Sequence, residues 1–156
     1  MSSKKLGEIL IEKGVITQAQ LSEALSLQKQ SKQFLGKIMI AKKMASEWQV
    51  LTALAEQFEV PLMKLEPAKV DFAAGEQYSI AFLQEQICIP IFQDEQTIRV
   101  AISNPLNAWA ISEIEARARG RNLELILATE ANILELVKEL GKRTLLKKGT
   151  PPKPGA

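Results

Sequence analysis

One helical pattern occurs twice in the first 60 residues of the chain. Residues 6–28 read LGEILIEKGVITQAQLSEALSLQ, and residues 35–57, which lie 29 positions later, read LGKIMIAKKMASEWQVLTALAEQ. Leu-Gly opens both copies, a glutamine closes both, and apolar residues recur at matching positions in between. Since one short helical unit cannot bury its own apolar face, we expect the two copies to pack together.

Each copy reads as a short helix, a turn and a longer helix. Thr17 and Ser46 precede the longer helices, and Gln20 and Gln49 follow three residues later, which is the spacing of a capping box. Behind each cap the apolar residues fall at helical spacing. The repeat therefore predicts two helical hairpins.

The turn between the two helices differs in composition between the copies. Gly14 suits the first turn because glycine adopts a left-handed conformation without steric cost. Its counterpart in the second copy is Lys43. We therefore expect the second turn to use a different and costlier geometry.

The pattern changes after residue 60 to an extended connector, short helices and runs of β-branched residues. Strands are predicted on either side of a turn near Asp94, followed by a helix capped by Asn107, a third strand, and a last helix from Glu130 to Leu140 that Thr129 caps. This order predicts an α+β protein. Its expected parts are a helical lobe at 1–60, an α+β lobe with about three strands at 61–140, and a flexible basic tail or linker at 141–156.

The composition excludes several classes of site. Histidine is absent and Cys88 is the single cysteine, which excludes disulfides, histidine-based catalysis and an ordinary Cys/His zinc site. Cys88 lies in an apolar strand pattern, so a buried residue is favoured over a reactive thiol. No phosphate-binding loop motif is present either. The sequence predicts a protein that is not an enzyme and needs no cofactor or metal.

Partners and location are also constrained by charge and hydropathy. With 46% hydrophobic and 24% charged residues, and no apolar run near the roughly 20 residues of a membrane span, a cytoplasmic protein without membrane insertion is expected. Residues 141–156 carry five basic residues and no acidic one. A nucleic-acid-binding arm and a solvated linker both fit, but no aromatic residue is interleaved, so the linker is favoured and DNA is not an expected partner.

Two interpretations of the repeat remain open. A helical bundle explains the leucines, but it does not by itself call for Gly7 and Gly36 or for Gln28 and Gln57. A ligand explains all of them. Glycine near a helix start admits phosphate, an amide can bind a base edge, and apolar walls for a planar base would come from Leu10, Leu25, Met39 and Leu54.

Residues 5–28, KLGEILIEKGVITQAQLSEALSLQ, resemble the 24-residue motif of the MshEN domain, which begins Arg-Leu-Gly and ends in Gln. Two such motifs stand in tandem in that family with a five-residue spacer, which residues 29–33 match. Residues 100–133 are similar to the part of the second lobe around the family's Asp-Pro-x-Asp, so the resemblance covers roughly residues 4–140. The domain occurs at the N-terminus of type II secretion and type IV pilus assembly ATPases, and many members bind cyclic di-GMP.

The resemblance implies a set of ligand-binding positions in both lobes. In the first copy these are Lys5, Leu6, Gly7, Leu10, Gly14, Leu21, Leu25 and Gln28. In the second copy they are Phe34, Leu35, Gly36, Met39, Val50, Leu54 and Gln57. The loop of the second lobe that reaches over the nucleotide in the family corresponds to Asn104 and Asn107.

The resemblance implies a regulatory domain that binds cyclic di-GMP and signals to a motor ATPase or an associated assembly protein. The family's arginines are replaced by Lys5 and Phe34, and its aspartates by Asn104 and Asn107. Lysine lacks the two-pronged geometry with which arginine binds guanine, so weaker binding is expected. The alternative is an interaction module or adaptor that no longer binds nucleotide. An excised domain and a stand-alone protein both fit the sequence.

Overall fold

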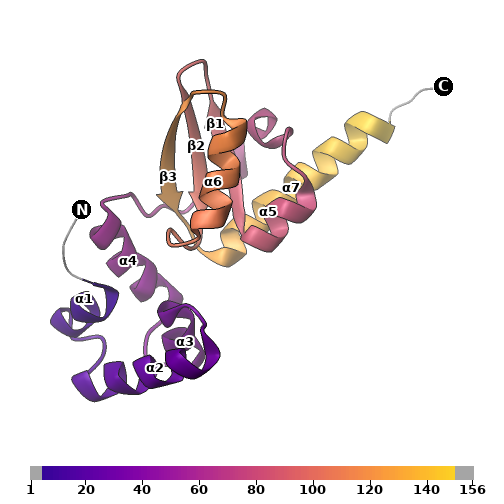
Figure 1. Cartoon of the computed structure of the whole chain (residues 1–156). Coiled ribbons are helices and arrows are strands. Elements are labelled where there is room, and N and C mark those ends of the chain that lie inside the picture. The colour runs from indigo at the N-terminus through magenta and orange to yellow at the C-terminus, as the bar shows by residue number, and fades with distance from the viewer. Residues whose placement is uncertain (1–4, 150–156) are drawn as a thin grey trace. The chain divides into compact units, whose positions relative to one another are not determined.

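The computed structural model describes residues 5–149, with side chains through residue 146. The chain divides into two compact units, residues 1–62 and residues 63–156. We call them the helical unit and the sheet unit and describe each by itself (Figure 1). The predicted α+β class is confirmed, because helices make up the first unit and a three-stranded sheet with helices makes up the second.

The helical unit pairs helices from different copies of the repeat. Its helices are α1 (Leu6–Glu12), α2 (Gln18–Ser31), α3 (Leu35–Ala41) and α4 (Glu47–Phe58). The main contacts join α1 to α4 and α2 to α3, so the two copies interlock. An ion pair of 3.1 Å between Lys13 Nζ and Glu56 Oε1 adds a surface contact between the end of α1 and α4.

The capping boxes form in both copies with matching geometry. Thr17 Oγ1 accepts a hydrogen bond from Gln20 N at 3.1 Å, and Gln20 Oε1 accepts one from Thr17 N at 2.9 Å. Ser46 and Gln49 make the same two bonds at 3.1 and 2.9 Å. The predicted repeat of helix, turn and capped helix is confirmed.

The two turns also share one geometry, so the expectation of a different second turn is wrong. Gly14 has φ of +73° and Lys43 has φ of +59°. The residues that follow them, Val15 and Met44, each donate a 2.9 Å backbone hydrogen bond, to the carbonyls of Leu10 and Met39 respectively. The helices that flank each turn impose the same backbone path in both copies. Lys43 follows this path although the left-handed conformation is sterically strained for a residue with a Cβ.

The sheet unit holds strands β1 (Cys88–Gln93), β2 (Thr97–Ile102) and β3 (Asn122–Leu127) in that order. β1 and β2 are antiparallel with an irregularity between Pro90 and Phe92, and β2 and β3 are parallel. Helix α6 (Ala108–Arg117) makes the crossover, and Asn107 caps it through Ala110 N at 3.1 Å. The three predicted strands and this cap are confirmed.

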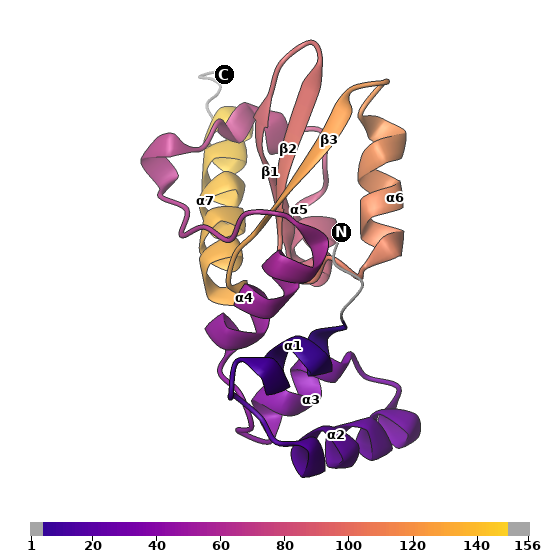
Figure 2. The same cartoon turned by 90° about the vertical axis from the view of Figure 1, so that its left-hand side faces the viewer.

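Helices cover both faces of the sheet. Figure 2 shows α6 on one face and α7 (Glu130–Gly149) on the other. Helix α5 (Ile80–Gln86) packs against α7 and β1. Within the sheet unit it is preceded by two short 3-10 helices, Pro67–Lys69 and Phe72–Gly75. Cys88 is fully buried, as predicted, and burial raises the pKa of its thiol to about 12. In the sheet it pairs with Ile102.

Helix α7 is longer than predicted. It continues past Leu140 to Gly149, so the expected flexible tail is wrong for residues 141–149. Gly141 does not end the helix. Two residues further on, Arg143 Nε donates to Glu139 Oε2 at 2.9 Å, and the Arg143 guanidinium carbon lies 4.2 Å from the centre of the Phe72 ring. These contacts support the extra turns. The rest of the predicted tail, residues 150–156, lies outside the described residues.

Side-chain bonds fix the start of α7 and the connector that leads into the sheet unit. Thr129 Oγ1 accepts from Asn132 N at 3.2 Å, which confirms the predicted cap. The Asn132 amide bonds both the N–H of Leu65, at 2.7 Å, and its carbonyl, at 3.0 Å. None of the helices within residues 5–149 has the length and apolar character needed to cross a membrane.

Candidate ligand-binding site

The glycines of the repeat make room for side chains of the same copy. A Cβ on Gly7 would lie 2.6 Å from Leu21 Cδ1, and one on Gly36 would lie 2.8 Å from Val50 Cγ1. Leu21 and Val50 are equivalent positions on α2 and α4. Both glycines therefore permit close packing of the two helices of a copy, and the bundle interpretation accounts for them without a ligand.

Most of the predicted apolar walls are core residues. Leu10, Met39 and Leu54 have no exposed surface, and Val50 is 2% exposed. Leu25 is the exception, with 41% of its surface exposed. In this conformation three of the four predicted wall residues contact protein rather than solvent, so a base could reach only Leu25 directly.

The positions that replace the family's arginines differ from one another. Lys5 is exposed, and its backbone N–H donates to Glu8 Oε1 at 3.2 Å at the start of α1. Phe34 is half-buried, and its ring lies against Gly36, where a Cβ would come within 2.8 Å of a ring carbon. A charged group is thus available in the first copy, whereas the second copy offers an aromatic edge.

The two closing glutamines also occupy different environments. Gln28 Nε2 donates to the carbonyl of Gln33 at 3.2 Å, which ties α2 to the spacer. Gln57 Oε1 is buried, and among the described residues no hydrogen bond reaches it. An unsatisfied buried acceptor of this kind costs about 1–3 kcal/mol, which makes Gln57 the one polar group of the repeat with an unmet requirement.

The two asparagines of the predicted set lie in the sheet unit and have local partners. Asn104 Oδ1 accepts from Leu106 N at 2.9 Å and shapes the loop before α6. Asn107 caps α6 with its oxygen and donates from Nδ2 to Gln86 Oε1 at 2.9 Å. Both amides therefore serve the local fold of this unit.

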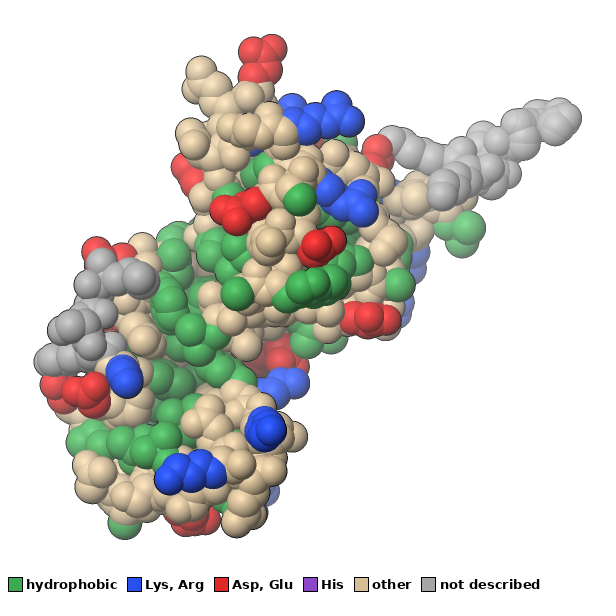
Figure 3. All heavy atoms as spheres, in the orientation of Figure 1, with side chains coloured by type: hydrophobic (Ala, Val, Ile, Leu, Met, Phe, Trp, Pro, Cys, Tyr) green, Lys and Arg blue, Asp and Glu red, His purple; other side chains and the backbone are tan. Residues whose placement is uncertain are grey.

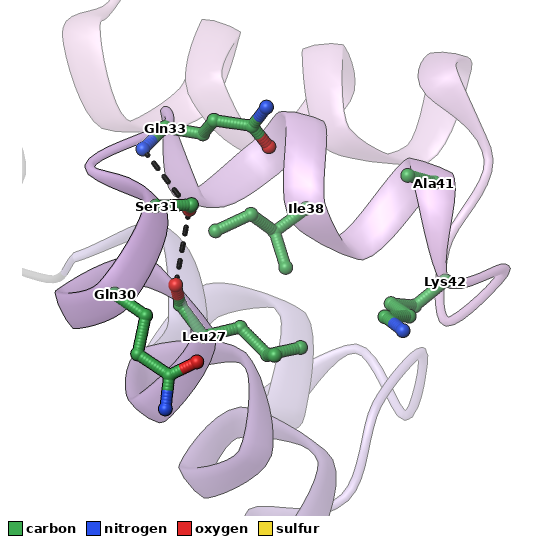
Figure 4. A pocket seen from close by; sticks show the side chains of 7 residues that line it. All are labelled: Leu27, Gln30, Ser31, Gln33, Ile38, Ala41 and Lys42. Carbon is green, nitrogen blue, oxygen red and sulfur yellow. Dashed lines mark hydrogen bonds between the residues drawn. The ribbon is translucent and has the colours of Figure 1, made fainter.

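The helical unit has a pocket of about 260 Å³ between the end of α2 and α3. Figure 4 shows Leu27 and Ile38 in it, beside Ser31, whose hydroxyl donates to the Leu27 carbonyl at 3.0 Å and accepts from Gln33 N at 3.3 Å. None of the predicted site residues lines this pocket, whose walls are Leu27, Gln30, Ser31, Gln33, Ile38, Ala41 and Lys42. No sequence pattern predicts this pocket, because helical periodicity does not report a gap between two helices.

The accessible groups of the predicted set are apolar, amide and ammonium groups. Seven side chains of the predicted set are exposed or half-exposed in the helical unit. They comprise one lysine, four apolar or aromatic groups and two amides, namely Lys5, Leu21, Leu25, Phe34, Leu35, Gln28 and Gln57. Within residues 5–149 there is no cluster of three or more acidic or cysteine side chains that could hold a metal ion. Apolar surface, amides and one ammonium group can bind a planar base and a phosphate.

The chain is similar to part of two larger known proteins. The type IV pilus assembly ATPase PilB of Thermus thermophilus is 25% identical over 117 residues, which is 74% of this chain and 13% of that protein. PilB of Myxococcus xanthus is 23% identical over 136 residues, 87% of this chain and 24% of that protein. The chain thus spans at most 24% of these two relatives.

Solved structures share the fold over most of the chain. A structure of MshE with cdg (cyclic di-GMP) matches with a TM-score of 0.78 and 28% identity, covering 88% of this chain and 99% of that one. The N-terminal domain of XpsE has the same fold, with a TM-score of 0.67, 20% identity and coverage of 88% and 97%. The model of the MshEN domain family matches residues 58–145, more than half of the sequence, and the chain belongs to the MshEN domain family.

Proposed function

We propose that this chain is a non-catalytic regulatory domain that binds cyclic di-GMP and signals its bound state to type IV pilus or type II secretion machinery. The observation that carries the proposal is the doubled motif. Its two copies have the same caps and turns, in a chain whose fold matches MshE with cdg over 88% of its length. A ligand with two bases and two phosphates matches a site built from two copies of one unit.

The unsatisfied oxygen of Gln57 supports a ligand at the end of the second copy. Guanine carries N–H donors on its Watson–Crick edge, and one of them would supply the missing hydrogen bond. Lys5 offers a charge for a phosphate or a guanine acceptor in the first copy. Leu25 offers an exposed apolar surface for a base.

The affinity is expected to be lower than that of a domain with both arginines. Loss of one charge-assisted hydrogen bond removes about 1.5–3 kcal/mol, which corresponds to about ten- to a hundredfold in Kd. Phe34 can stack on a base but donates no hydrogen bond. The double substitution Lys5→Arg with Phe34→Arg should therefore tighten binding.

Isothermal titration of the chain with cyclic di-GMP, with GMP as the control ligand, tests the proposal. We expect saturable binding of the dinucleotide, tighter binding by the double arginine variant, and weaker binding by Gln57→Leu. Gln30→Leu is the matched control, because Gln30 is an exposed glutamine of α2 outside the motif. Absence of binding by both the wild type and the arginine variant at high micromolar nucleotide would exclude the receptor function.

A second candidate is an interaction module that no longer binds nucleotide. It is favoured by the complete burial of Leu10, Met39 and Leu54 and by the ring of Phe34 against Gly36, since the helical unit forms its core without a ligand. This candidate predicts no change in the melting temperature with cyclic di-GMP. A bound ligand at 100 times its Kd would instead stabilise the fold by about 2.7 kcal/mol.

A further inference from the structure

The last described turns of α7 carry an apolar side chain that the sheet unit does not cover. Leu145 is 71% exposed, although the neighbouring turns of the same helix bury Ile133, Leu136, Val137 and Leu140. Hydrophobic atoms protrude beside this end of α7 in Figure 3. A single exposed leucine is ordinary on a protein surface, so its meaning depends on the residues beside it on the helix.

Leu145 belongs to a stripe that is distinct from the core face of α7. The stripe contains Ala131, Leu134, Lys138, Gly141 and Leu145, at successive steps of three, four, three and four residues. All five are exposed or half-exposed. The spacing is that of the seam of a two-helix coiled coil, here with a lysine and a glycine between the two leucines.

A groove beside the stripe has room for an incoming side chain. The groove lies between α5 and α7 and has a volume of about 380 Å³. Its walls are mostly apolar and come from Ile80, Gln84, Leu134, Val137, Lys138 and Gly141. Gly141 has no side chain to project into it, and a Cβ there would only touch Ile80 at 3.9 Å. A helix can therefore approach α7 closely at this point.

The charged residues that flank the stripe are complementary to those of a second, antiparallel copy of the same stripe. Glu135 and Lys142 follow directly after the seam positions Leu134 and Gly141, and both are exposed. When two copies of the seam lie antiparallel, these flanking positions face each other across the pair. Glu135 of each helix then opposes Lys142 of the other, so one two-fold axis creates two ion pairs.

We infer that α7 is a self-association surface, on which a second copy of this chain pairs antiparallel through the same stripe. Leu145 of each copy fills the groove beside Leu134 of the other, and Lys138 lies opposite Gly141, where its stem has room. Such a contact is isologous, since one patch serves both partners. The inference does not depend on nucleotide binding.

A second copy fits this stripe because the stripe is complementary to itself. Helix α7 carries both Leu145 and Leu134, which lines the groove 11 residues earlier, and it carries both Glu135 and Lys142, 7 residues apart. Another partner would need to reproduce both features in the same order. One helix pair buries less surface than a standard interface, so the association should be weak and visible only at high concentration.

Sedimentation velocity of the full chain, from about 10 µM to about 1 mM, tests the inference. We expect a reversible monomer–dimer equilibrium. Leu145→Lys should weaken it at least about tenfold, because it places a charge in the apolar groove. Leu106→Lys is the matched control, since Leu106 is 50% exposed in the same unit but lies outside the stripe, and it should leave the equilibrium unchanged.

A charge exchange tests the antiparallel register. Glu135→Lys and Lys142→Glu should each weaken the dimer, because each places like charges opposite each other. The double variant restores both ion pairs with reversed sign and should return to within about threefold of the wild-type Kd. A wild type that stays monomeric at every concentration overturns the inference. So does a dimer that is insensitive to Leu145→Lys, or a double variant no better than the singles.

Discussion

Lys43 is a residue at which the two copies of the repeat differ in backbone cost. It adopts the left-handed conformation that Gly14 adopts without strain in the first copy. The cost of this conformation for a residue with a Cβ is about 1–2 kcal/mol. The chain tolerates it because the flanking helices require the same turn in both copies.

Lys43→Gly is therefore expected to stabilise the protein by about 1 kcal/mol, somewhat less than the relieved strain because glycine also loses more chain entropy on folding. Gly14→Lys is the mirror substitution and should destabilise by a similar amount. Urea unfolding followed by circular dichroism measures both. A destabilising Lys43→Gly would mean that the turn is not strained.

At the scale of elements, the short helix and the long helix of each copy meet at a glycine. Gly7 of α1 accepts Leu21 of α2, and Gly36 of α3 accepts Val50 of α4. Because the same packing occurs in both copies, it is sufficient to explain why both contain glycine at this position.

Gly7→Ala should destabilise the protein by about 1–3 kcal/mol, because its Cβ would lie 2.6 Å from Leu21 Cδ1. Leu21→Ala removes the clashing atoms, so the two substitutions together should cost less than the sum of the singles. A double-mutant cycle from chemical denaturation gives this coupling directly. Strict additivity would show that Leu21 moves away freely and that the glycine has another role.

At the scale of the whole molecule, each unit has its own buried core. Leu54 is fully buried among the helices of the helical unit, and Ile98 is fully buried in the sheet unit. Leu54→Ala and Ile98→Ala should each remove about 2–5 kcal/mol from the unit that contains them. The two variants are matched, because both delete an apolar side chain with no exposed surface.

Hydrogen exchange measured by mass spectrometry should separate the two effects. Leu54→Ala is expected to speed exchange in α1 to α4 and to leave β1 to β3 unchanged, while Ile98→Ala should do the reverse. Compact units with separate cores open independently on this timescale. Faster exchange in both units from either substitution would contradict this prediction.

Much of the architecture could be predicted from the sequence. Thr17, Ser46, Asn107 and Thr129 were identified as caps, and each makes the expected bond. Two strands followed from β-branched runs on either side of the Asp94 turn, and the third from the apolar run after α6. The main element missed was the end of α7, because glycine followed by a basic, proline-rich segment also reads as a linker.

The candidate site was less predictable than the fold. The sequence identified which positions repeat, but it could not distinguish a leucine that faces a ligand from one that faces the core. Leu10, Leu25, Met39 and Leu54 all lie at helical spacing within the repeat, yet of these four only Leu25 is exposed. Periodicity locates an apolar face, and only the neighbouring helix decides how much of that face is covered.

The sequence by itself determined the repeat, the caps, the strands and the absence of histidine and paired cysteines. The repeat, the strand pattern and the missing residue types depend on residue identity and spacing, and the caps depend on hydrogen bonds between residues three positions apart, all of which a linear pattern contains. Tertiary structure alone decided that α1 packs on α4 and α2 on α3, that Gln57 keeps an unmet acceptor, and that a groove runs beside Gly141. Those outcomes depend on which distant surfaces meet, because close packing fills space between elements that the sequence places far apart.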